Sequence, residues 1–320
     1  MTSELTVNGT AGSPVYFTSW TDDSIGGDTN HNGASIGGPN QWTGMVFNPG
    51  SSSSSLDYMV LRFGGAFGSA GIAISGSSPL FSNCSVTSFY NSGVSLGSTV
   101  CAPTFQSCAF NSNNSAVDNV RIESVPGFTN CTATGNIIHD VISITDGNVL
   151  SSLTIAPLNL ISGAMRFLTD LSVAAGATLT LQAGIVCKFT PYQQHEYQQV
   201  NIDGALIVNG TPGQEVVFTS IVDDAYAGDT NKNGPSTVGP NLWRTVLFNA
   251  STTPSVINRM RVRGAGSFGN AGVRLAAGAN VAMTSSTSEI NINEALSLSN
   301  ATSTASFTSC TFDTSNRAVD

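Results

Sequence analysis

A four-residue motif, Phe-x-x-Cys, recurs at nearly constant spacing and limits the folds open to this chain. It begins at Phe81, Phe105 and Phe128, at spacings of 24 and 23 residues, and returns at Phe307. A unit of that length, made of short strands and turns, is typical of one coil of a parallel β-helix. Stacked coils would place the phenylalanines in one column and the cysteines in another.

Hydrophobic residues elsewhere come in short alternating runs rather than at helical spacing. Such runs occupy residues 5–7, 15–17, 59–63, 179–181, 206–208 and 216–218. Alternation with period two predicts strands with one buried face. Gly, Asn, Ser, Pro and Thr lie between the runs and supply turns. We therefore predict an all-β chain with no helix longer than two turns.

A longer repeat divides the chain. The segment DDSIGGDTNHNG at residues 22–33 returns as DDAYAGDTNKNG at residues 223–234, 201 positions later. Its flanks repeat as well, since LTVNGT at 5–10 matches LIVNGT at 206–211, and Trp42 matches Trp243. The repeat predicts a first β-helix module over residues 1–204, partial at its N-terminal side. A second, truncated copy would cover 205–320 within one continuous solenoid.

The order of motifs after residue 171 points to a known class of repeat. GATLTL, AGIVCKF, GALIVNGT, PGQEVVFTS and the second Asp/Asn segment follow one another. This order resembles the right-handed parallel β-helix repeats of large bacterial and archaeal cell-surface proteins. The resemblance implies a right-handed parallel β-helix with protruding Asp/Asn-rich loops. It also implies a structural or adhesive role in a cell-surface or filament protein, with a polysaccharide-active enzyme (lyase or glycosidase) or a glycan-binding module as alternatives.

The repeated Asp/Asn segment fits D-x-N-x-N-G, the opening of a calcium loop. Alternate oxygen side chains can converge on one ion, and the glycine permits the turn between them. The twelfth position is Pro39 or Pro240 rather than Glu, so the loop is not an EF-hand. We predict weak Ca²⁺ binding of the extracellular kind, and the alternative is a loop closed by its own Asx turns without metal. The predicted ligands are Asp22, Asp23, Asp28, Asn30 and Asn32, and in the second copy Asp223, Asp224, Asp229, Asn231 and Asn233.

The six cysteines permit disulfides, but columns of parallel side chains suit disulfide geometry poorly. We predict a buried ladder of free thiols at Cys84, Cys108 and Cys131, with one or more disulfides as the alternative. Cys101, in a predicted turn, is expected to pair or to be exposed.

No set of residues predicts catalysis. The carboxylate and Arg/Lys motifs of polygalacturonases and pectate lyases do not occur together, so we assign no catalytic residue. His139 and Asp140 are the remaining acid–base pair, and a turn with a surface histidine explains them more simply.

Three other features have structural explanations. Trp42 and Trp243 are expected to lie over the base of each Asp/Asn loop, with a sugar platform as the alternative. Arg259, Arg261 and Arg263 alternate along one strand and should face outward beside acidic groups. The segment at 191–199 is predicted to be a polar loop between coils, whose tyrosines could contact a glycan.

Composition favours an exported protein. Charged residues make up 10% of the chain, the net charge is −9 and the pI is near 4.6, which disfavours nucleic acid as a partner. No apolar run reaches the roughly 18 residues of a membrane span, and the start is not a signal peptide. We expect an extracellular or cell-surface piece of a longer protein. Its partners would be neighbouring coils of that protein, a second copy stacked head to tail, or a glycan.

Overall fold

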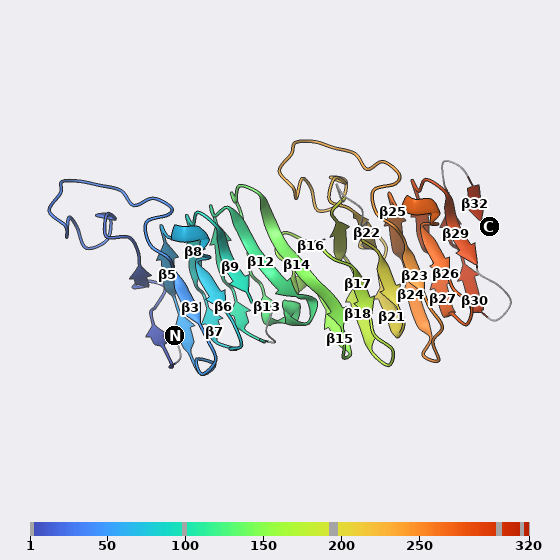
Figure 1. Ribbon diagram of the computed structural model, residues 1–320, viewed down its shortest axis with the longest axis horizontal. Coiled ribbons are helices and arrows are strands. Elements are labelled where there is room, and N and C mark those ends of the chain that lie inside the picture. The colour runs from blue at the N-terminus through green and yellow to red at the C-terminus, as the bar shows by residue number, and fades with distance from the viewer. Residues whose placement is uncertain (1–2, 98–100, 192–197, 299–302, 314–316, 320) are drawn as a thin grey trace. The chain divides into compact units, whose positions relative to one another are not determined.

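The computed structural model describes residues 3–97, 101–191, 198–298, 303–313 and 317–319 (Figure 1). It divides into two compact units, residues 1–143 with 158–162, and residues 144–157 with 163–320. Both are all-β, and every strand pairing described between numbered strands is parallel. The all-β parallel solenoid is therefore confirmed, whereas its right-handed sense stays a prediction. Helical structure among the described residues is limited to four short 3₁₀ turns, η1 (Ala66–Gly68), η2 (Ile122–Gly127), η3 (Pro157–Asn159) and η4 (Ser267–Gly269).

Each coil of the first unit gives one strand to each of three parallel sheets. The first sheet contains β1 (Thr6–Asn8), β4 (Ser55–Asp57), β7 (Leu80–Ser82), β10 (Thr104–Gln106) and β13 (Phe128–Thr129). The second contains β2 (Val15–Phe17), β5 (Met59–Arg62), β8 (Ser85–Thr87) and β11 (Ala109–Asn111). The third contains β3 (Met45–Phe47), β6 (Ile72–Ile74), β9 (Ser92–Leu96) and β12 (Ser115–Arg121).

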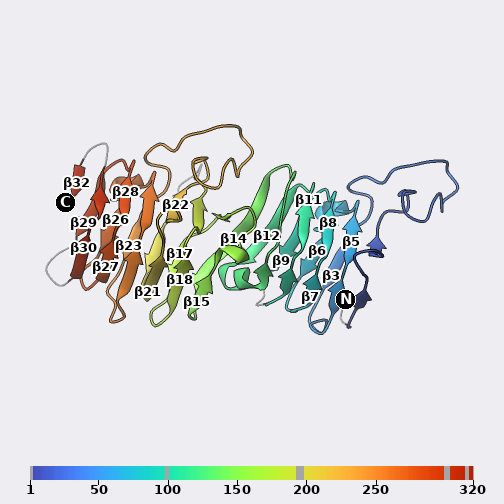
Figure 2. The same cartoon turned by 180° about the vertical axis from the view of Figure 1, so that it is seen from behind.

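The second unit repeats this three-sheet plan, and Figure 2 shows its strands from behind. One sheet contains β15 (Leu153–Ile155), β18 (Thr178–Gln182), β21 (Ala205–Asn209), β24 (Ser255–Asn258), β27 (Asn280–Thr284) and β30 (Thr304–Thr308). Another contains β16 (Ala164–Phe167), β19 (Val186–Phe189), β22 (Val216–Ser220), β25 (Met260–Arg263), β28 (Thr287–Glu289) and β31 (Thr311–Phe312). The last contains β14 (His139–Val149), β17 (Leu171–Val173), β20 (Val200–Ile202), β23 (Val246–Phe248), β26 (Val273–Leu275), β29 (Glu294–Leu298) and β32 (Arg317–Val319).

The phenylalanine column forms the core of the first unit. Phe105 lies in register with Phe81 on one side and Phe128 on the other. Its ring is stacked on theirs, with centroid distances of 4.7 Å and 4.9 Å. All three side chains are fully buried. The Phe-x-x-Cys spacing thus predicted both the coil length and the residues that meet between coils.

The cysteine ladder is also confirmed. Cys84, Cys108 and Cys131 are buried free thiols. Cys108 Sγ donates to Phe81 O at 3.6 Å, and Cys131 Sγ donates to Phe105 O at 3.4 Å, so each thiol bonds the carbonyl one coil earlier. The prediction for Cys101 was wrong: it is a free, buried thiol, because it belongs to an inward-facing alternation with Pro103 and Phe105.

The third residue of each motif turns the corner between two sheets. Asn83, Ser107, Asn130 and Ser309 all have φ between 53° and 54°. Few residues other than glycine tolerate this left-handed region, and short polar side chains are among them. This requirement explains why the motif reads Phe-x-Asn/Ser-Cys at every occurrence.

A long loop leaves the strands at the same place in each unit. One connects β2 to β3 and the other connects β22 to β23 (Figure 1). These two loops carry the repeated Asp/Asn segments. The segment at 191–199, by contrast, falls mostly outside the described residues, at 192–197. In the described part of the chain, no helix has the length and hydrophobicity needed to cross a membrane.

Candidate functional site

The base of the first Asp/Asn loop is an ion pair between Asp22 and Arg62. The Asp22 carboxylate is buried and accepts hydrogen bonds from Arg62 Nε at 2.7 Å, from Thr18 Oγ1 and from Ser24 Oγ at 2.7 Å. Burial alone would raise the pKa of Asp22, but these hydrogen bonds and the Arg62 charge hold it below its usual value. A cation of the chain itself therefore already neutralises this carboxylate.

The second loop repeats this base. Arg263 Nη1 donates to Asp223 Oδ2 at 2.8 Å, and Thr219 Oγ1 donates to the same oxygen at 2.7 Å. Neighbouring Arg261 binds Glu215 through Nε at 2.6 Å and Glu289 through Nη1 at 2.8 Å. The predicted pairing with acids thus holds for Arg261 and Arg263. Arg259 differs because its φ of 55° places it at the corner before β25.

Arg62 and Arg263 also hold the far end of each loop. Trp42 Nε1 donates to Arg62 O at 2.9 Å, and Trp243 Nε1 donates to Arg263 O at 2.7 Å. Trp243 is fully buried and stacks on Phe189 at 4.7 Å, which confirms packing at the loop base and excludes a sugar platform there. One arginine in each copy therefore binds the Asp at the start of the loop and the Trp at its end.

The tips of the two loops are closed by the same hydrogen bonds. The Asp28 carboxylate accepts from the backbone N–H of Asn32 at 3.2 Å and of Gly33 at 3.0 Å. Asp229 accepts equivalently from Asn233 at 3.2 Å and Gly234 at 2.9 Å. These bonds reach residues four and five positions on, and in the first loop they are joined by an Asx turn in which Asn32 N donates to Asn30 Oδ1 at 3.2 Å. Such bonds belong to the metal-free alternative, and they also keep the aspartate inside the loop.

A second aspartate in each copy is only half satisfied. Asp23 Oδ2 accepts from Ser35 N at 2.6 Å, and Asp224 Oδ2 accepts from Ser236 N at 2.6 Å. The other oxygen, Oδ1, is buried without a hydrogen-bond partner in both. Unpaired buried carboxylate oxygens are costly, and a cation would satisfy them. Within the described ranges, no group of three or more His, Cys, Asp or Glu residues could by itself hold a metal ion, so amide or carbonyl oxygens would have to contribute.

Lys188 is a functional candidate that sequence reasoning missed. It is fully buried, and its Nζ donates to Gly228 O of the second loop at 2.8 Å. Burial lowers the pKa of Lys188 to about 8, although Asp224, Asp223 and Asp229 act in the opposite direction. The ammonium therefore lies within the field of all three loop aspartates. Its signal in the sequence was a lone lysine inside the apolar run AGIVCKF.

His139 does not lie in a surface turn, so that prediction was wrong. It begins β14 and is buried, because it faces inward on that strand together with Val141, whereas Ile137 and Ile138 before the strand are exposed. Its Nε2 is 3.0 Å from Asp118 Oδ1 and 3.1 Å from Ser143 Oγ, and its Nδ1 is 3.1 Å from Val141 O. Ser and Asp meet the same ring nitrogen, so this is not the relay of a serine hydrolase.

Replacing His139 with Gln is expected to raise the pKa of Asp118. Burial alone would raise that pKa, but the hydrogen bond and charge of His139 now hold it below its usual value. A depressed folded-state pKa stabilises the fold above the unfolded pKa of about 3.9, and this stabilisation is lost as the pH falls through the folded pKa. The variant should therefore lose less stability on acidification than the wild type. Carboxyl NMR titration of Asp118 measures the shift; Asp140→Asn is the control, and an unchanged pKa in the histidine variant would contradict the pairing.

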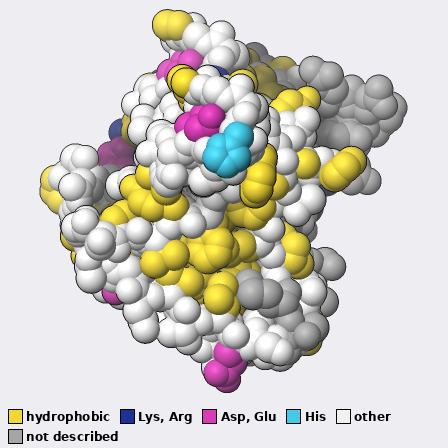
Figure 3. Space-filling view, turned by 90° about the vertical axis from the view of Figure 1, so that its left-hand side faces the viewer, with side chains coloured by type: hydrophobic (Ala, Val, Ile, Leu, Met, Phe, Trp, Pro, Cys, Tyr) yellow, Lys and Arg dark blue, Asp and Glu magenta, His cyan; other side chains and the backbone are white. Residues whose placement is uncertain are grey.

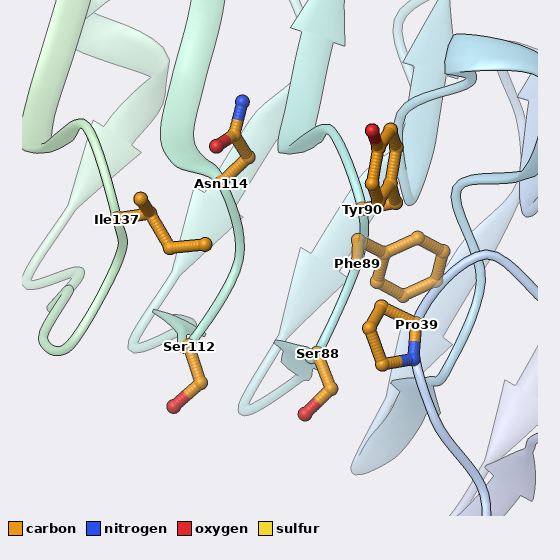
Figure 4. A pocket seen from close by; sticks show the side chains of 7 residues that line it. All are labelled: Pro39, Ser88, Phe89, Tyr90, Ser112, Asn114 and Ile137. Carbon is orange, nitrogen blue, oxygen red and sulfur yellow. The ribbon is translucent and has the colours of Figure 1, made fainter.

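A groove crosses the corners of successive coils in the first unit (Figure 4). It encloses about 310 Å³, at the low end of the range for ligand pockets of about 300–1,000 Å³. None of the residues that line it is charged: they are Pro39, Ser88, Phe89, Tyr90, Ser112, Asn114 and Ile137. Pro39 comes from the first Asp/Asn loop, and the others come from corners beside β8, β11 and β14. The sequence alone predicts no binding role for these residues.

A second groove, of about 500 Å³, lies in the second unit beside Glu215 and Tyr226. Glu215 is bound by Arg261, and the Arg263 guanidinium lies 5.1 Å from the Tyr226 ring centroid. Glu215 and Tyr226 at this groove are therefore already in contact with arginines of the chain itself.

Comparison with protein-family models, with curated proteins and with solved structures finds no match to this chain.

Proposed function

We propose that the chain is a structural or adhesive segment of an extracellular cell-surface or filament protein, and that its two Asp/Asn loops bind Ca²⁺. The observation that carries the calcium proposal is the buried Oδ1 atom of Asp23 and of Asp224, left without a partner in both copies. The loops otherwise share one set of hydrogen bonds. The same carboxylate oxygen lacks a hydrogen-bond partner at two sites 201 residues apart, which supports a common ligand rather than two packing defects.

The residues present fit a hard cation that prefers oxygen. Asp23, Asp28, Asn30 and Asn32 supply carboxylate and amide oxygens, and backbone carbonyls can complete the six to eight that calcium takes. Asp224, Asp229, Asn231 and Asn233 are their counterparts, and Asn231 Oδ1 is also buried without a partner. Asp22 and Asp223 remain predicted ligands, although each would have to exchange its arginine for the ion.

The extracellular and adhesive parts of the proposal rest on surface chemistry. The chain carries few charges and covers its coils with Ser, Thr, Asn and Gly. Hydrophobic side chains gather in the middle of one face, surrounded largely by uncharged atoms (Figure 3). A face of this kind suits contact with another coil, either of the same parent protein or of a second copy stacked head to tail.

Calorimetric titration with CaCl₂ tests the metal. We expect binding with a dissociation constant of about 10⁻⁴–10⁻³ M, since Asn replaces Asp at two positions of each loop. The double variant Asp23→Asn/Asp224→Asn should weaken binding at least about tenfold, because each site loses the charge of its unpaired oxygen. Glu4→Gln, at an exposed position outside the loops, is the matched control. Absence of binding, or binding unaffected by the double variant, would overturn the calcium proposal.

Electron microscopy of the purified chain, with calcium and with chelator, tests assembly separately. Calcium-dependent filaments with a regular axial repeat support head-to-tail stacking. Dispersed particles in both conditions contradict self-assembly and leave neighbouring coils of the parent protein as the partner.

A further inference from the structure

A row of side chains lines the groove of the first unit, one from each of three successive coils. Tyr90, Asn114 and Ile137 occupy these positions at spacings of 24 and 23 residues. Backbone bonds stack the corners, from Asn114 N to Phe89 O at 3.1 Å and from Ile137 N to Asn113 O at 3.0 Å. Neighbouring coils are about 4.8 Å apart, so this row extends about 10 Å along the coil axis. We call these three residues the corner strip.

The corner strip exposes large apolar side chains. Ile137 is 72% exposed and Tyr90 is 62% exposed, and Phe67, in the 3₁₀ turn η1 of the preceding coil, is 98% exposed. Single exposed apolar residues are common, but a row at coil spacing beside a groove is an interaction surface. Figure 4 shows the rings of Phe89 and Tyr90 on one side of the groove and Ile137 on the other, with Asn114 between them.

The polar groups of the groove are neutral, and Asn114 is available to a ligand. The Asn114 amide carries both donors and an acceptor, and no described residue is hydrogen-bonded to its side chain. The hydroxyls of Ser88 and Ser112 point the same way from successive coils at the lower edge of the groove (Figure 4). A ligand that matches this lining is uncharged, has flat apolar faces and has hydroxyls around its edges. Sugar rings have that chemistry, because one face of a pyranose presents C–H groups while its rim carries hydroxyls.

Backbone strain at Phe67 argues against a purely structural role. Its φ of 56° lies in the left-handed region, which is strained for a residue other than Gly, Asn or Asp. An almost fully exposed ring buries almost no apolar surface that would offset this strain. Phe268, the residue 201 positions later, has a φ of 58° and is also exposed. Both copies thus keep an exposed phenylalanine at a strained corner that glycine would occupy without strain.

The second copy supplies an internal comparison. Arg62 pairs with Thr87 and Arg263 pairs with Glu289, so positions 88, 89 and 90 correspond to Ile290, Asn291 and Ile292. Isoleucine therefore replaces the Tyr90 ring, and Glu289, which is bound to Arg261 and Arg263, stands where the first copy has Thr87. The second copy lacks the aromatic Tyr90 platform and carries charge beside this corner, where the first copy is neutral. Any ligand selective for the corner strip should ignore the second copy.

We infer that the corner strip binds a strand of an uncharged polysaccharide laid along the coil axis. Sugar rings would lie against Tyr90 and Ile137, and Asn114 would bond their hydroxyls. A linear chain suits the site because the strip repeats one contact per coil along a line. The inference goes beyond the calcium proposal and stands without it.

Binding of the full chain to neutral oligosaccharides tests this inference. The panel contains β-glucan, xylan, mannan and chitin fragments, with polygalacturonate as the acidic comparison. We expect at least one neutral oligosaccharide to bind and polygalacturonate not to bind. Tyr90→Ala and Asn114→Ala should each weaken that binding about tenfold or more, while Tyr90→Phe retains most of it. Phe268→Ala is the matched control and should leave the affinity unchanged.

The variants lie at the surface, so circular dichroism should show wild-type folding and a loss of affinity can be assigned to the strip. Three results would overturn the inference: no binding to any neutral fragment, binding that survives Tyr90→Ala and Asn114→Ala, or selective capture of apolar peptides instead of sugars. Repeating the oligosaccharide titration in the presence of a chelator distinguishes binding at this site from binding of metal at the Asp/Asn loops.

Discussion

Phe105→Ala is expected to lower the free energy of unfolding by about 3–5 kcal/mol, the range for removing a buried aromatic ring. Phe105 is the middle ring of the column, stacked between Phe81 and Phe128 and edge-on to Phe110 at 5.7 Å. Its loss removes both stacking contacts and leaves a cavity between coils that strand pairing holds apart. Urea unfolding followed by circular dichroism measures the effect.

Phe67→Ala is the matched control for this substitution. The same atoms are removed, but the ring is exposed, so the free energy of unfolding should change by no more than about 0.5 kcal/mol. A loss below about 1 kcal/mol for Phe105→Ala would contradict a tightly stacked column. Coils contact mainly their neighbours, so a partial early transition in the variant would place the damage in the first unit.

Arg263→Ala should destabilise the chain by a similar amount, about 3–5 kcal/mol, which is typical of breaking a buried ion pair from one side. The Asp223 carboxylate is only 1% exposed and would lose its charged partner. Arg62→Ala repeats the experiment in the first copy, where Asp22 is equally buried. Chemical denaturation measures stability, and limited proteolysis reports whether the loop between β22 and β23 is released.

Two further variants make this test specific. Arg259→Ala removes the same side chain from a residue that makes no ion pair with any described residue, and should change stability by no more than about 0.5 kcal/mol. Asp223→Asn combined with Arg263→Ala should recover part of the loss, since the stranded charge is gone. Two results would contradict the role of the ion pair in anchoring the loop. One is an unfolding midpoint for Arg263→Ala equal to that of the wild type, and the other is no recovery of stability in the double variant.

The coil was predictable because its signals are local and periodic. Phe81, Phe105 and Phe128 mark the coil length directly, and short alternating runs mark the strands. The packing of Trp42 and Trp243 followed from their shared place in the repeat. Cys101 and His139 were misplaced because their inward alternation, with Pro103 and Phe105 and with Val141, can be recognised only once the bounds of the neighbouring strands are known.

The candidate sites were less accessible to sequence reasoning. Lys188 meets Gly228 across 40 positions, and His139 meets Asp118 across 21, so their pairings depend on the register between coils. The corner strip left a trace in the spacing of residues 90, 114 and 137. Spacing alone could not show that these side chains face outward, because neighbouring corner residues such as Phe89 face the core. The calcium ligands stay predictions in both loops.

The double attachment at Arg62 and Arg263 makes each loop a natural insertion point. Strand β2 pairs with β5 and β3 pairs with β6, and the end of the loop between them bonds the next coil from Asn40 N to Gly64 O at 2.7 Å and from Gln41 N to Phe63 O at 3.2 Å. Arg62 holds both ends of the first loop, through Asp22 and Trp42, and Arg263 holds both ends of the second, through Asp223 and Trp243. The chain between those anchored ends can therefore be exchanged for an unrelated sequence at little cost to the coil. In evolution or in the laboratory, a new binding segment grafted between residues 24 and 38 would be held by the existing contacts at both ends.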